Sequence, residues 1–103
     1  MDKVYECDLS KLKDLKKVLE ADPYAKDSFA RTGYKLRDGA SLGEDKAKTF
    51  LYISASEDFF KKADELLKGI ASQLKGGPAD RVIGKIKFEE ESAESGLGSI
   101  FGG

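Results

Sequence analysis

The sequence predicts an α+β fold in which strands and helices follow one another in the order βαββαβ. Two segments carry apolar residues at helical spacing, and each lies between segments rich in strand formers. The chain has 103 residues, a length that fits one domain. Hydrophobic residues make up 40% of it, which is enough for one modest core.

The first half of the chain contains two predicted strands with a helix between them. Residues 3–8 are rich in strand formers and predict a short strand. A helix over about residues 9–21 follows, and Pro23 ends it because proline lacks a backbone N–H. Residues 28–37 alternate between two faces, which predicts a half-buried strand. The apolar residues of the helix recur at a spacing of three and four: Leu9, Leu12, Leu15, Val18 and Leu19.

The second half contains a predicted central strand, a second helix and an ambiguous segment. Residues 48–54 are apolar on both faces, which is typical of a strand in the middle of a sheet. Ser56 is a good N-cap for the helix that follows, and Gly76-Gly77-Pro78 is expected to end it. Residues 81–88 fit a strand or a helix, and their β-branched residues and alternation favour the strand.

These elements are most simply combined as a ferredoxin-like sandwich. A right-handed crossover in each βαβ half gives a four-stranded antiparallel sheet with two helices on one face. We expect a single α+β domain over residues 1–88. Residues 89–103 form an acidic and then glycine-rich tail, predicted to be mobile or to dock on a partner.

Composition excludes several kinds of chemistry. Without histidine and with one cysteine, the chain has no His or Cys cluster for a metal and no His for acid–base catalysis. We therefore expect no catalytic residues, metal site or cofactor. No apolar run is long enough to span a membrane, and the single thiol is typical of a cytoplasmic protein.

Charge is distributed unevenly along the chain. Residues 1–88 carry 18 basic and 15 acidic side chains, a net charge of +3, whereas the tail carries four glutamates and no base. Within the predicted strand 28–37, one face combines cations with an aromatic ring, a pattern used to bind single-stranded RNA. The residues of this candidate nucleic-acid face are Phe29, Arg31, Lys35 and Arg37.

Two further features of the sequence have an ordinary structural explanation beside a functional one. Cys7 lies beside Asp8, whose negative charge would raise the pKa of the thiol, and we expect it to be buried. The tail carries Leu97, Ile100 and Phe101 among glycines, so these residues are either an unstructured end or a docking segment.

The leading functional interpretation is a non-enzymatic module that self-associates as a homodimer or binds a protein partner. A thin core with helices on one side of the sheet would leave apolar groups that need cover from a second copy. The alternative is binding of single-stranded RNA through the basic face. A second alternative is small-molecule binding or catalysis in a dimer cleft.

Overall fold

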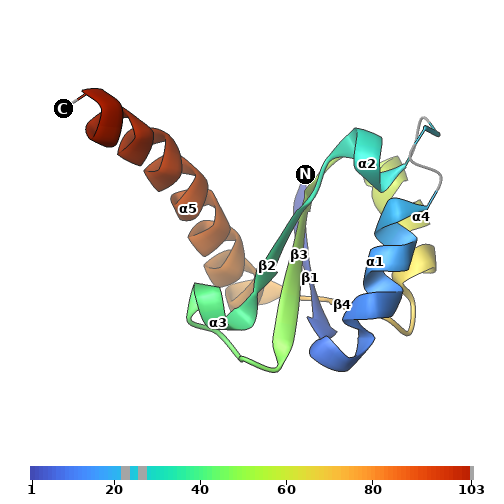
Figure 1. Cartoon of the computed structure of the whole chain (residues 1–103). Helices are drawn as coiled ribbons and strands as arrows, with labels where there is room; N and C mark the ends of the chain where they lie inside the picture. Colours follow the sequence, from blue (N-terminus) through green and yellow to red (C-terminus); the bar gives the residue numbers. More distant parts are fainter. Residues whose placement is uncertain (22–23, 26–27, 103) are drawn as a thin grey trace.

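The computed structural model (Figure 1) describes residues 1–21, 24–25 and 28–102, with side chains described as far as Glu89. It confirms an α+β fold with a four-stranded sheet of order β2-β3-β1-β4, in which every neighbouring pair is antiparallel. The strands, in chain order, are β1 (Asp2–Asp8), β2 (Lys35–Asp38), β3 (Lys48–Ser54) and β4 (Ser72–Gln73).

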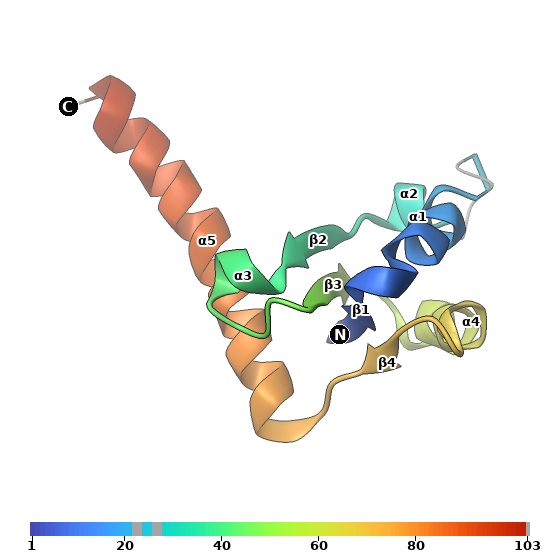
Figure 2. The same ribbon diagram turned by 60° about the horizontal axis from the view of Figure 1, so that its bottom comes forward.

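The helices lie on both sides of this sheet (Figure 2). In chain order they are the 3₁₀ helix η1 (Leu9–Lys11), then α1 (Leu12–Glu20), α2 (Phe29–Thr32), α3 (Gly39–Leu42), α4 (Glu57–Leu67) and α5 (Gly76–Gly102). Helices α1, α2 and α4 lie on one side of the sheet and α5 on the other. The two predicted helices, α1 and α4, lie on one face as expected, whereas α5 covers the face that the prediction leaves open.

The central strand β3 is confirmed, because its residues from Thr49 to Ile53 are all buried. It pairs with β1 on one side and β2 on the other. Since successive side chains point to opposite faces, Leu51 and Ile53 pack toward α1 and α4, and Phe50 and Tyr52 toward α5.

The core between the sheet and helices α1 and α4 forms largely as the spacing of apolar residues predicts. Leu15 and Leu19 are the buried residues of α1, so the predicted helix over residues 9–21 is confirmed as η1 followed by α1. Helix α4 begins at the predicted cap, where the Ser56 hydroxyl accepts a hydrogen bond from the Phe59 N–H at 3.3 Å. It ends at Leu67, earlier than predicted, and the backbone turns at Gly69, which has φ +81°.

The predicted strand over residues 28–37 is wrong in its first half. The Ser28 hydroxyl accepts a hydrogen bond from the Arg31 N–H and caps the short helix α2. Gly33, at φ +90°, ends α2, and only Lys35–Asp38 pair with β3. Local capping therefore overrides the alternation of the side chains in this segment.

The predicted strand over residues 81–88 is also wrong, because this segment is helical in α5. Val82 and Ile86 lie one helical turn apart and pack on Val4, Phe50 and Tyr52. The fourth strand is instead the short segment Ser72–Gln73. As a result, α5 covers the sheet face that was predicted to need a second copy.

Helix α5 runs on past the body of the molecule. Its C-terminal part stands clear of the sheet and of the other helices (Figure 1). The backbone of residues 89–102 is thus part of α5, whereas the side chains beyond Glu89 lie outside those described. Mobility or docking of this segment remains a prediction. Within the described ranges, no helix is long and apolar enough to cross a membrane.

Candidate interaction surface

A groove of about 570 Å³ lies between α3 and α5, at the point where α5 leaves the body. From α5 it is lined by residues at positions i, i+3, i+4 and i+7, which share one face of a helix. These residues are Arg81, Gly84, Lys85 and Phe88, and the carboxylates Asp80 and Glu89 of α5 line the groove beside them. Helix α3 supplies Leu42 to the opposite wall. We call this feature the α3–α5 groove.

Two glycines place α3 beside α5. A Cβ at Gly39 would lie 1.8 Å from the Asp45 carbonyl oxygen, so no other residue fits there without moving the backbone. Gly43, at φ +72°, then ends α3 in the left-handed conformation. The chain turns back so that the Glu44 N–H donates to the Gly39 carbonyl at 2.8 Å. This turn directs the next side chain, that of Glu44, toward α5.

Glu44 holds the loop after α3 against α5 through ion pairs. Arg81 Nε and Nη2 each donate to a Glu44 carboxylate oxygen at 2.8 Å, and Lys85 Nζ also donates to this carboxylate. These hydrogen bonds lower the pKa of Glu44 to about 2. The carboxylate is only 11% exposed and is ionised at neutral pH. The Glu44 carboxylate therefore has a structural role, and it is poorly suited to acid–base catalysis.

Phe88 is the exposed apolar residue of the groove. Its surface is 68% exposed, although it lies only two residues after the fully buried Ile86. Arg81 also reaches solvent, with 54% of its side chain exposed despite its pairing with Glu44. The α3–α5 groove thus offers an exposed apolar ring among charged side chains of both signs, and Glu44 already pairs with its two cations. An aromatic ring with a polar surround is a feature of protein interfaces.

The structure does not bring the candidate nucleic-acid residues onto one strand face. Phe29 lies on α2 and is only 3% exposed. Its ring packs edge-to-face on the ring of Phe59, with 5.3 Å between the ring centroids. Arg31 is exposed on the same short helix, while Lys35 and Arg37 lie on β2. A buried ring cannot stack on a base, so nucleic-acid binding stays a prediction without its aromatic platform.

The candidate docking residues Leu97, Ile100 and Phe101 belong to the backbone of α5, and their side chains lie outside those described. No motif in the sequence marks Leu42, Gly84 and Phe88 as residues of one groove. One available signal was Pro78 in the first turn of a helix, combined with the spacing of Val82 and Ile86.

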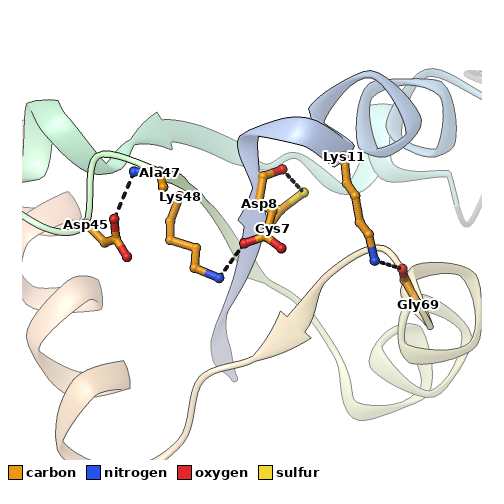
Figure 3. Close-up of polar contacts among 7 residues, drawn as sticks. All are labelled: Cys7, Asp8, Lys11, Asp45, Ala47, Lys48 and Gly69. Carbon is orange, nitrogen blue, oxygen red and sulfur yellow. Dashed lines mark hydrogen bonds and ion pairs between the residues drawn. The ribbon is translucent and has the colours of Figure 1, made fainter.

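A separate small cavity of about 150 Å³ lies at the end of β1, where Asp8, Lys11 and Lys48 line it. Figure 3 shows the polar contacts of these residues. Asp8 forms an ion pair with Lys48, and Lys11 Nζ donates to the Gly69 carbonyl at 2.9 Å. Both cations thus hold neighbouring segments together. Among the described residues, no group of acidic, His or Cys side chains could hold a metal ion.

Cys7 is buried, as expected, and its thiol donates to the Asp8 carbonyl at 3.3 Å. Burial raises the pKa of the thiol, and the charge of Asp8 raises it further. A thiol with a raised pKa holds little of the reactive thiolate. Cys7 therefore has a structural role in the core.

A scan against protein-family models found no match to this chain. Searches of curated proteins and of solved structures found no match either.

Proposed function

We propose that this protein is a non-enzymatic interaction module that self-associates through α5. The observation that carries this proposal is the helical segment after Glu89, which extends away from the body (Figure 1). Phe88, just before this segment, is exposed. Because α5 covers the sheet face within one chain, the proposed contact lies on α5 and not on the sheet.

Helix energetics support this proposal. Most helical stability in proteins comes from packing of one helix face, so a stretch of helix that packs against nothing depends on its intrinsic propensity alone. Between residues 89 and 102, Gly96 and Gly98 lie in the helix interior, and each costs roughly 1 kcal/mol of helix stability relative to alanine. Packing against a partner is the usual source of the missing stability, and a second copy is the partner that is always present.

Two narrower assignments accompany this proposal. The order β2-β3-β1-β4, with α1 leading from β1 to β2 and α4 from β3 to β4, supports a ferredoxin-like unit to which α5 is added. A single buried thiol supports a cytoplasmic location.

Sedimentation equilibrium of the full chain tests self-association. We expect a concentration-dependent dimer between the micromolar and millimolar ranges, and a monomer throughout that range would overturn the proposal. The double variant Leu97→Asp with Ile100→Asp should be monomeric. Its matched control, Leu97→Met with Ile100→Leu, keeps both positions apolar and close in volume and should remain a dimer.

A further inference from the structure

A pocket of about 320 Å³ is lined by residues of α1, α2 and α4, the helices on the side of the sheet opposite α5 (Figure 2). We call it the α1–α4 pocket. It shares no described residue with the α3–α5 groove. Its volume lies at the lower end of the range for small-molecule sites. The pocket is therefore a candidate site for a small ligand, separate from the helix proposed to mediate self-association.

Each of the three helices contributes an apolar side chain to the α1–α4 pocket. These side chains are Val18 of α1, Phe29 of α2 and Leu66 of α4. The Phe29 ring is held in place by its burial and by its edge-to-face contact with Phe59. Leu66 is 45% exposed, although the next residue, Leu67, is buried. An apolar ligand in the pocket would remove part of this exposed surface from water, which favours binding.

The charge at the α1–α4 pocket is positive. Lys17 of α1 and Lys62 of α4 line it, both residues are exposed, and no described lining residue is acidic. Lys62 already interacts within the chain. The Lys17 ammonium, in contrast, has no ion-pair or hydrogen-bond partner in the described part of the chain. An unpaired cation beside an apolar wall is complementary to a ligand with an apolar body and one negative charge.

We infer that the α1–α4 pocket binds a small amphipathic carboxylate, whose alkyl chain lies on Val18, Phe29 and Leu66 and whose carboxylate pairs with Lys17. Burial of the chain supplies most of the affinity, because an ion pair exposed to water contributes little. The volume of the pocket limits the ligand to a short or medium chain. The site lies away from α5, so ligand binding and self-association are tested separately.

Titration of the full chain with octanoate, followed by two-dimensional amide NMR spectra, tests the site. We expect saturable shifts at the backbone amides of Val18, Phe29 and Leu66, with a dissociation constant on the order of 0.1 to 1 mM for a ligand of this size. 1-Octanol has the same chain without the charge and should bind about threefold more weakly. Acetate has the charge without the chain and should not saturate the protein. Octanoate shifts that are absent, or that lie only outside the pocket, would overturn the inference.

Leu66→Glu tests the apolar wall. Glutamate favours helix and places a negative charge where the alkyl chain should lie, so the affinity for octanoate should fall about tenfold or more. Leu9→Glu is the matched control, because Leu9 is 46% exposed, undergoes the same change of charge and does not line the pocket. It should bind octanoate as the wild type does. Circular dichroism checks that both variants are folded, and wild-type affinity in a folded Leu66→Glu variant would contradict the site.

Lys17→Gln tests where the carboxylate lies. It keeps a side chain that favours helix and removes the charge, so octanoate binding should weaken about threefold while 1-octanol binding stays unchanged. Lys16→Gln is the matched control, because Lys16 is exposed on the same helix and does not line the pocket. It should change the binding of neither ligand. An equal loss for both ligands in Lys17→Gln, or no loss for octanoate, would show that Lys17 does not hold the carboxylate.

Discussion

Arg37 and Glu89 connect the edge strand β2 to α5: Arg37 Nε donates to the Glu89 carboxylate at 3.1 Å. Arg37 also donates through Nη1 to the Leu36 carbonyl at 3.1 Å, which orients the guanidinium. The contact joins the candidate nucleic-acid face to the first residue of the predicted acidic tail. One cation of that face is therefore engaged within the chain.

The Arg37–Glu89 pair should contribute little to stability, because both side chains are more than one third exposed. A double-mutant cycle with Arg37→Ala and Glu89→Gln should give a coupling energy of about 0.5 kcal/mol in urea unfolding. Added salt should reduce this coupling. A coupling that is large and insensitive to salt would show that the pair is part of a buried network.

The ion pairs of Glu44 should make the free energy of unfolding depend on pH in the acid range. Its folded pKa, about 2, lies below the ordinary value of 4.5, so its contribution is complete above pH 4.5 and is lost as pH falls toward 2. Glu44→Gln should cost roughly 1 kcal/mol near neutral pH and flatten the pH dependence in that window. Thermal unfolding between these pH values measures the effect. A pH dependence that Glu44→Gln leaves as steep as in the wild type would contradict the role of these ion pairs.

The N-terminal half of α5 is part of the core and should behave as such. Ile86 is 0% exposed, so Ile86→Ala should cost about 2 to 4 kcal/mol in denaturant unfolding of the monomer. Phe88→Ala, two residues later at an exposed site, should change the same quantity by less than about 0.5 kcal/mol. Equal effects at the two positions would contradict the packing of α5 on the sheet.

Thr49 offers a way to stabilise the protein. Its side chain is 1% exposed, and its hydroxyl has no hydrogen-bond partner among the described residues. Thr49→Val replaces this hydroxyl with a methyl group of similar size and should raise the free energy of unfolding by about 1 kcal/mol. Thr49→Ser keeps the hydroxyl and loses the methyl group, so it should lower that free energy by a similar amount. A loss of stability in Thr49→Val would show that the hydroxyl is satisfied.

Deleting residues 92–103 should separate folding from assembly. These residues follow the last packed turns of α5, so the free energy of unfolding should change by no more than about 1 kcal/mol when both proteins are monomeric. The same deletion should abolish the dimer in sedimentation equilibrium. A large loss of monomer stability would instead place Leu97, Ile100 and Phe101 in the core of their own chain.

Several elements of the fold follow from local patterns. The apolar run Phe50–Ile53 predicted a strand covered on both faces, because alternating side chains on both faces were apolar. The leucine spacing of α1 and the Ser56 cap predicted two helices, since these signals act within a few residues along the chain. Burial of Cys7 in the core was also predictable from its neighbours.

Where the spacing of apolar residues fits both a strand and a helix, tertiary packing decided which of the two forms. Val82 and Ile86 are four residues apart, which is two strand repeats and also about one helical turn, so spacing alone could not assign residues 81–88. The helix is favoured by the apolar sheet face at Val4, Phe50 and Tyr52. A helix over residues 81–88 buries Val82 and Ile86 against that face. The same packing brought Arg81 and Lys85 to Glu44, some forty residues earlier in the chain, and created a groove that no local pattern in the sequence marks.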